Sequence, residues 1–217
     1  MAAALPGAIA PAPIAEVVET ATTEFLAQCL EPEDLSYAVM PPFGSWVKAT
    51  DEDSGHQIYG IVYHATTSPI DSVHRARALG LSLAELRDQQ PQIFAMLKTE
   101  FRTAIVGFRP APGRNGRASP IYQHLPPRPP QVHQAVYGAL PGEVMAFSDR
   151  LDFLRTLLTV AAAPVDSLIA ATLRDIYQLR KGDRPWLVKA GRQLSILLKD
   201  DYDRLQTILG QVYLGQP

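Results

Sequence analysis

The spacing of hydrophobic residues changes along the chain, and the change divides it into two halves. Up to about residue 140, short runs rich in β-branched and aromatic residues alternate with polar turns, as is typical of β-strands. Beyond Pro141-Gly142, apolar residues recur every three or four positions, as is typical of amphipathic helices. The pattern therefore predicts a β-rich half followed by a helical half.

A pair of apolar runs in the first half predicts a β-hairpin. Trp46-Val47 and the strongly β-prone run Ile58 to Tyr63 flank a polar turn, Asp51 to Gly55. Gly44 and Gly60 lie at the edges of these runs, where a small barrel often needs glycine so that a strand can bend or two backbones can approach. We expect this hairpin to form the middle of a small β-barrel.

Flanking segments are expected to supply the other strands. Between residues 14 and 30 the periodicity leaves helix and strand open, but five β-branched residues fall within positions 17–23. Such residues lower helix propensity and favour strands, so we predict Ala15–Thr20 and Glu24–Leu30. Further strands are expected at Glu100–Phe108 and, more briefly, at Gln131–Tyr137.

Helical signals occur at one site within the β half and throughout the second half. Ser82-Leu-Ala-Glu85 has the form of a capping box and predicts a short helix to about Gln89, followed by a helical turn from Ile93 to Lys98. After residue 141 the pattern predicts about four helices: Asp149 to Val160, Val165 to Leu179, a third near Pro185 that Asp183 caps, and a fourth from Asp200.

The predicted architecture is α+β, a closed barrel of about six strands followed by a helical domain. We expect a flexible lead-in at residues 1–13, a barrel domain with helical and proline-rich insertions at 14–140, and a helical domain at 141–217. The apolar stripes of the helices need either each other or a partner. We predict a docking face on the last helix, formed by Leu205, Ile208, Leu209 and Val212.

Composition narrows the class of protein but does not identify its function. With 47% hydrophobic and 19% charged residues the chain is an ordinary globular one, and a net charge of −2 lacks the basic surplus of dedicated DNA-binding domains. The single cysteine, Cys29, cannot form an intramolecular disulfide, which fits a reducing compartment, and its apolar surroundings indicate a small buried residue. No apolar stretch reaches the ~20 residues of a membrane span.

Candidate chemistry is weak throughout the chain. The nearest approach to a phosphate-binding loop, residues 112–119, lacks the spacing and the lysine of a P-loop. The five histidines show no metal-binding spacing, and no second cysteine could help to build a zinc site. Asp51, Glu52 and Asp53 are read as a solvated turn. We therefore predict no catalytic residue, no cofactor and no metal, and a protein that is not an enzyme.

One local feature could bind a partner. No acidic residue occurs between Glu100 and Glu143, while the same stretch carries a basic strip made of Arg102, Arg109, Arg114, Arg117 and Arg128. Such a strip could meet nucleic acid, an anionic membrane surface or an acidic protein, or could merely keep a proline-rich loop soluble. Aromatic residues suited to base stacking are sparse there, which disfavours single-strand binding.

Several segments together resemble a known family. They are EVVETATTEFLAQC, PPFGSWVKA, IYGIVYHATTSPID, ARALGLSLAELRDQQPQIFAMLKTEFRTAIVGF and LPPRPPQVH, followed by LDFLRTLL and LLKDDYDRL. In their order, over roughly residues 14–212, they resemble the HAS-barrel family as it occurs in cyanobacteria. The family is named after the barrel shared by HerA-type helicases and ATP synthase subunits.

The resemblance implies a six-stranded barrel that contributes assembly and not chemistry. The P-loop ATPase domain that follows the barrel in larger relatives is replaced here by helices, so motor activity is not implied. We expect a non-enzymatic assembly or interaction protein, docking onto a larger complex or onto itself. The alternative is an accessory factor for nucleic-acid processing. The expected location is cytoplasmic, with the cytoplasmic face of thylakoids and peripheral membrane association left open.

Overall fold

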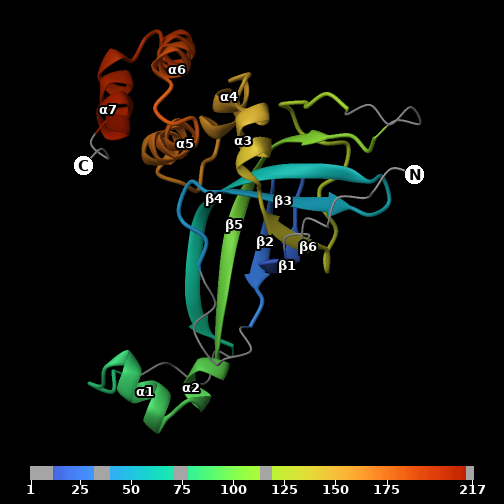
Figure 1. The fold of residues 1–217 in the computed structure, drawn as a ribbon, viewed down its shortest axis with the longest axis vertical. Coiled ribbons are helices and arrows are strands. Elements are labelled where there is room, and N and C mark those ends of the chain that lie inside the picture. The colour runs from blue at the N-terminus through green and yellow to red at the C-terminus, as the bar shows by residue number, and fades with distance from the viewer. Residues whose placement is uncertain (1–11, 32–39, 71–77, 113–118, 214–217) are drawn as a thin grey trace, which may run out of the picture.

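A computed structural model describes residues 12–31, 40–70, 78–112 and 119–213. The β half forms a closed barrel whose strand order is β1-β2-β5-β4-β3-β6, with every pairing antiparallel. The six strands are β1 (Ala15–Thr20), β2 (Glu24–Cys29), β3 (Trp46–Asp51), β4 (His56–Pro69), β5 (Leu97–Arg109) and β6 (Ala135–Gly138). The predicted six-stranded barrel is therefore confirmed (Figure 1).

The barrel interior is filled by residues that alternate along the strands. Every second residue of β2 is buried, at Phe25, Ala27 and Cys29, as a strand with one face on the core requires. Gly60 lies where the β4–β5 register shifts, and a Cβ atom there would lie 2.2 Å from a methyl carbon of Thr103. The same Cβ atom would lie 3.0 Å from the carbonyl oxygen of Ala104, so Gly60 lets the backbones of β4 and β5 approach, which is one of the two roles predicted for it.

Closure of the barrel depends on β6, which is shorter than predicted. The expected strand covered Gln131–Tyr137, but pairing with β1 and β3 is limited to Ala135–Gly138. His133 has a φ of 72°, a left-handed conformation that a strand cannot contain. The chain therefore turns before it enters the barrel.

Strands β4 and β5 continue past the rest of the barrel as a two-stranded ribbon. At its end lie the short helices α1 (Leu83–Gln89) and α2 (Gln92–Ala95), away from the rest of the molecule (Figure 1). The predicted capping box is present: the backbone N–H of Glu85 donates to Ser82 Oγ at 3.3 Å, and the backbone N–H of Ser82 donates to Glu85 Oε2 at 2.8 Å.

Five helices follow the barrel: α3 (Pro141–Phe147), α4 (Phe153–Leu157), α5 (Val165–Leu179), α6 (Arg184–Leu197) and α7 (Tyr202–Tyr213). Helix α5 has the predicted bounds, and Asp183 caps α6 by accepting from the backbone N–H of Trp186 at 3.2 Å. Helix α3 was not anticipated, and the helix predicted for Asp149–Val160 is only the single turn of α4.

The helices and the barrel share one hydrophobic core. Trp46, Tyr59 and Val106 belong to barrel strands, and they lie in the same buried cluster as Phe147 and Phe153 of the helical region. The ring centroids of Trp46 lie 5.1 Å from Phe147 and 5.4 Å from Phe153, as in packed aromatic pairs. The second half of the chain therefore packs against the outside of the barrel instead of standing apart from it.

Candidate functional site: an outward face of helix α6

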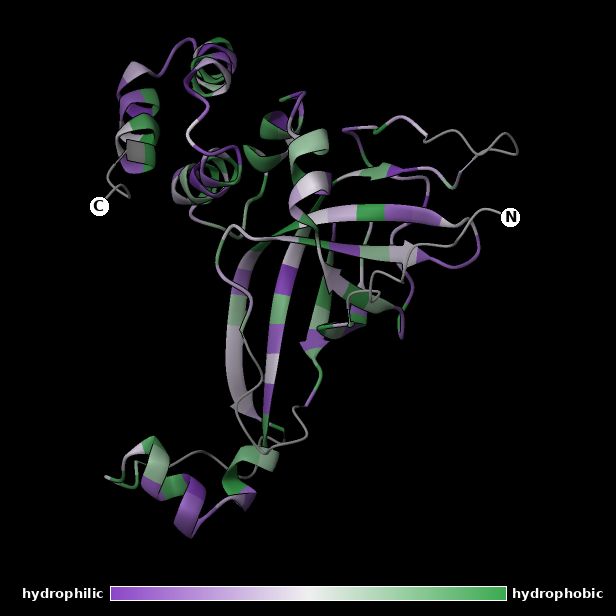
Figure 2. Cartoon of the chain, viewed as in Figure 1, coloured by the Kyte–Doolittle hydropathy of each residue, from purple (hydrophilic) through white to green (hydrophobic). Residues whose placement is uncertain are grey.

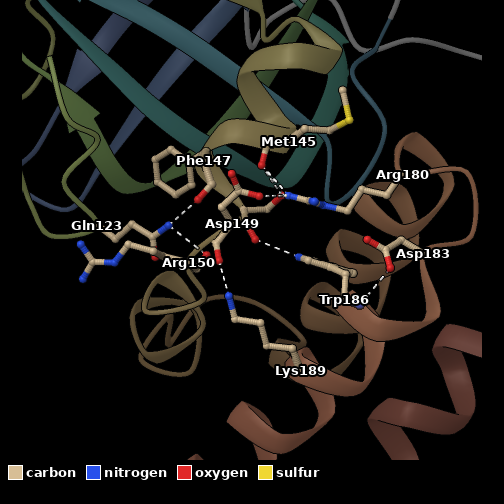
Figure 3. A network of polar contacts seen from close by, with 10 residues as sticks. Gln123, Met145, Phe147, Asp149, Arg150, Arg180, Asp183, Trp186 and Lys189 are labelled. Carbon is tan, nitrogen blue, oxygen red and sulfur yellow. Dashed lines mark hydrogen bonds and ion pairs between the residues drawn. The ribbon is translucent and has the colours of Figure 1, made fainter. Parts of the chain in front are cut away.

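A network of polar contacts holds the helices in a fixed orientation on the barrel (Figure 3). At its centre, Arg180 Nη2 donates to the carbonyl oxygen of Met145 at 2.5 Å, to Ser148 Oγ at 3.0 Å and to Asp149 Oδ1 at 2.8 Å. The guanidinium also lies 5.2 Å from the ring centroid of Trp186. A cation placed at the C-terminal end of α3 satisfies carbonyl groups that the helix leaves unpaired and complements its dipole.

Helix α6 contributes two further donors to the same segment. The indole Nε1 of Trp186 donates to the carbonyl oxygen of Ser148 at 2.9 Å, and Lys189 Nζ donates to that of Asp149 at 2.5 Å. Gln123 joins the loop before β6 to this segment by donating to the carbonyl of Phe147 at 2.6 Å. The first turns of α6 are therefore anchored through α3 to the barrel (Figure 3).

A second anchor joins α5 to the turn before β3. Gly44 has a φ of 84°, and a Cβ atom there would lie 2.8 Å from the Cβ of Ala171. The hydroxyl of Thr172 lies 3.5 Å from the carbonyl oxygen of Gly44. Glycine is thus needed both for the backbone conformation and for the close approach of the helix.

With its inner side anchored, α6 presents an outer side of mixed character. Four exposed residues recur at every fourth position on it, namely Arg184, Val188, Arg192 and Ile196, and Lys199 follows in the next turn. Side chains at this spacing lie along one side of a helix. Val188 is 52% exposed and Ile196 66% exposed, while the opposite side buries Trp186, Leu187, Ala190 and Leu194. We call the five outward residues the α6 outer stripe.

The charge of the α6 outer stripe is positive and largely uncompensated. Helix α6 contains no acidic residue, and within the described part of the chain no carboxylate pairs with Arg184 or Arg192. Lys199 lies 3.9 Å from the exposed Asp200, at the limit of an ion pair. Exposed apolar side chains flanked by unpaired cations form a surface complementary to an apolar patch with an acidic rim.

The docking face predicted on α7 is occupied by the chain itself. Leu205, Ile208 and Val212 are buried, and Leu209 packs against the same core, which includes residues of α5. The sequence pattern left open whether the helical stripes would cover each other or a partner, and α5 and α7 cover each other. Leu205, Ile208, Leu209 and Val212 are therefore not available to a partner in this fold, and that prediction is corrected.

Three of the five arginines of the predicted basic strip lie within the described residues, and two of these pair with carboxylates. Arg102 pairs with Glu24 at 3.2 Å and Arg128 pairs with Asp53 at 3.3 Å, through acidic residues from distant strands and turns. Arg109 lies at the end of β5 with its Nε atom buried. Arg114 and Arg117 lie outside the described residues. The stretch contains no acidic residue in the sequence, but in the folded chain Glu24 and Asp53 lie next to its arginines.

Aromatic rings gather beside this strip more densely than the sequence indicated. Phe108 stacks against His56 at 5.3 Å and against Tyr122 at 5.4 Å between ring centroids, and His124 lies 5.5 Å from Phe108. The contact depends on an isolated β-bridge between Phe108 and Tyr122, which brings the loop before β6 onto the end of β5. Tyr122 and His124 are exposed and leave aromatic surface at this end of the barrel.

An open cleft of about 1070 Å³ lies between this loop, the barrel and α4. On its barrel side, Glu24 accepts from the hydroxyl of Tyr63 and pairs with Arg102. Burial, together with the hydrogen bond to Glu24 and its negative charge, raises the pKa of Tyr63 to about 12. Arg155 lines the other side and is exposed. The lining of the cleft thus contains charges of both signs. Among its described residues, no nucleophile is hydrogen-bonded to a base.

The other residues that could have carried chemistry do not form a site among the described residues. Cys29 points into the barrel core, and burial raises the pKa of its thiol to about 11. Within the described ranges, no three His, Cys, Asp or Glu side chains lie close enough together to hold a metal ion. None of the described helices combines the length and the hydrophobicity that a membrane crossing requires.

Comparison with family models finds a similarity for most of the barrel. Residues 14–109 match the model of the HAS barrel domain. The matched range includes β1 to β5, while β6, which closes the barrel, and helices α3–α7 lie beyond it. A search of curated proteins found no match to the chain.

Sequence reasoning missed the α6 outer stripe although its signal is present. The four-residue spacing of Arg184, Val188, Arg192 and Ile196 can be read directly, but the interpretation followed apolar residues alone and therefore selected the side of each helix that faces the core. A surface helix normally carries polar residues opposite its buried side, so β-branched residues alternating with cations there are the signal in the sequence.

Proposed function

We propose that this protein is a non-enzymatic assembly protein, which docks onto a larger protein complex through the outer side of its helical region while the HAS barrel serves as its rigid base. The observation that carries the proposal is the α6 outer stripe. Val188 and Ile196 remain exposed at 52% and 66% although the rest of α6 is anchored by a polar network. Large apolar residues fixed in place and flanked by unpaired cations are typical of protein-binding surfaces.

The chemistry of the surface defines the partner that the proposal requires. An acidic rim around an apolar patch would match Arg184, Arg192 and Lys199 on one side and the two β-branched side chains on the other. Such charges mainly raise the association rate and select among partners, and the buried apolar contact supplies most of the affinity. Because the helix is already anchored, binding requires little ordering.

The resemblance to HAS-barrel proteins supports the same proposal without supplying a partner. In that family the barrel contributes assembly, and the match to residues 14–109 makes this role relevant here. The proposal includes a cytoplasmic location, at the cytoplasmic face of thylakoid membranes if the host is a cyanobacterium. Both parts of that location rest on the resemblance alone.

A second candidate function is favoured by one observation. The exposed rings of Tyr122 and His124 lie close to Phe108, whose chain continues into the arginine-bearing segment after β5. Stacking surface beside cations is the arrangement that single-stranded nucleic acid requires. Against it, Arg102 and Arg128 are already paired with carboxylates. We therefore rank an accessory role in nucleic-acid processing second.

Affinity purification of the tagged full chain from its native host separates the two proposals. The purification is run at moderate and at high salt, and both bound proteins and bound nucleic acid are identified. Recovery of one protein complex in fixed proportion at both salts supports the assembly role. Recovery of nucleic acid that is lost at high salt, and lost when Arg114, Arg117 and Arg128 are replaced by glutamine, contradicts it and supports the second.

A further inference from the structure

The ribbon formed by β4 and β5 lacks the neighbours that normally stabilise such an element. Strand β3 pairs with β4 only as far as Ile61, and the Val62 backbone bonds to Gly44 and Ser45. Beyond that point, from Tyr63 to Pro69, no strand of the described chain pairs with the outer edge of β4 (Figure 1). Strand β2 pairs with β5 only as far as Glu100, so Thr67–Pro69 and Leu97–Thr99 have no third strand, and a two-stranded pair of this kind is marginally stable at best in water.

The tip of the ribbon carries apolar residues that the described chain leaves exposed. Ile70, Leu83 and Met96 are 54%, 53% and 43% exposed, and α1 contains no buried residue. In Figure 2 both short helices carry hydrophobic (green) positions, and they lie away from the barrel and from the helical region. Helices of four and seven residues are too short to be stable alone. The tip therefore resembles one side of an interface whose partner surface is not supplied by the described chain.

The free edge of β4 is unusual in carrying no formal charge. From Tyr63 to Pro69 the sequence is Tyr-His-Ala-Thr-Thr-Ser-Pro, without lysine, arginine, aspartate or glutamate. Exposed edges are normally protected by charged residues, because a row of unpaired N–H and C=O groups invites another strand. An uncharged edge can lie against an identical copy of itself without placing like charges opposite one another.

A second apolar feature lies at the other end of the same edge. Met40, Pro42, Phe43, Tyr63, Ala65 and Pro164 line a groove of about 450 Å³. Met40 and Phe43 are 42% and 41% exposed, and the residues that line the groove include no lysine, arginine, aspartate or glutamate. One edge therefore has an apolar tip at one end and an apolar groove at the other.

We propose that two copies of this chain dimerise by laying their β4 edges side by side, antiparallel, so that the tip of each ribbon packs into the groove of the other copy. A two-fold axis between Thr66 and Thr67 would place Ile70 of one copy opposite Tyr63 of the second. The interface is isologous: each copy supplies both the tip and the groove, as two-fold symmetry requires. This proposal rests on the proposed assembly role only in that it names one partner, a second copy of the chain. The α6 outer stripe lies outside the dimer interface and stays free for another partner.

Mass measurement in solution tests the dimer directly. Sedimentation of the full chain should give twice the 23.8 kDa chain mass. Two variants change exposed positions in different parts of the interface: T66K/T67K places like charges across the two-fold axis, and L83D places a charge on the tip. Both should sediment as monomers with unchanged circular dichroism, whereas Q206K, on the exposed side of α7, should remain dimeric.

Cross-linking tests the geometry. A cysteine introduced by T66C should be joined to its counterpart by a short bismaleimide and give a covalent dimer, whereas Q206C should not, and buried Cys29 should not react in either variant. A monomeric wild type, or a dimer that survives both T66K/T67K and L83D, would overturn the proposal. The assembly role is tested separately, because V188D/I196D should remain dimeric while losing its partner complex.

Discussion

Replacing Arg180 should loosen the helical region from the barrel. Arg180 Nη2 reaches three acceptors, and its side chain is 13% exposed. Hydrogen bonds from a charged donor contribute about 1.5–3 kcal/mol each, and a contact with an aromatic face adds about 0.5–1 kcal/mol. One amino group has two protons for the three acceptors, and the buried Nε has no partner among the described groups. We therefore expect R180M to lower the free energy of unfolding by about 3 kcal/mol.

Three further variants measure how much individual contacts of Arg180 contribute to the free energy of unfolding. Asp149 is 70% exposed, so its ion pair is screened by solvent, and D149A should cost less than about 0.5 kcal/mol. R180K retains the charge without the fork geometry and should cost about half as much as R180M. R155M removes an exposed arginine from α4 and serves as the matched control.

Urea unfolding followed by tryptophan fluorescence and by helical circular dichroism measures these differences. Trp46 reports on the core shared by barrel and helices, and Trp186 reports on the network itself. In the wild type both signals should change in one transition, because the core is continuous. An R180M variant within about 0.5 kcal/mol of wild type, or a D149A variant as unstable as R180M, would refute the reasoning.

Three further predictions concern packing and pH. G107A should cost more than about 2 kcal/mol in denaturant unfolding, because its Cβ would lie 2.2 Å from the carbonyl oxygen of Tyr122, whereas G138A, with open space around it, should be neutral. I208A should lower the free energy of unfolding by about 2–5 kcal/mol, because the side chain of Ile208 is fully buried. The same substitution on an open docking face would be nearly neutral. The pKa of Tyr63 is raised from 10.0 to about 12, so its contribution is complete below pH 10 and is lost as the pH rises through 12. The stability gap between wild type and Y63F should therefore narrow between pH 10 and 12, and a gap that widens contradicts the assignment.

Strand positions were predictable where local signals and tertiary packing agreed. The hairpin around residues 46–63 combines β-branched runs with a polar turn, and its position was predicted, although β4 continues six residues past the predicted run, to Pro69. Val165–Leu179 repeats its apolar residues at helical spacing, and its bounds were predicted as observed. Helix α3 was not predicted because its seven residues include Pro141 and Gly142 and show no extended stripe. Its position is set by partners far along the chain, chiefly Arg180.

Site prediction was less successful because it depends on which surfaces meet. Apolar periodicity identified Leu205 and Ile208 correctly as one side of a helix, but it could not tell that α5 would cover that side. The acid-free stretch around Arg102 and Arg128 was real in sequence, yet Glu24 and Asp53 approach it through the barrel topology. Burial and charge pairing between distant segments are tertiary properties that no local pattern records.

The proposed assembly role is tested most directly by the α6 outer stripe. Tagged wild type, V188D/I196D and the control Q206D are purified in parallel from the native host, and the recovered proteins are quantified by mass spectrometry. We expect one complex to accompany wild type and Q206D and to fall at least tenfold with V188D/I196D, because charges would enter the apolar contact. Equal recovery of that complex with all three proteins would contradict the account.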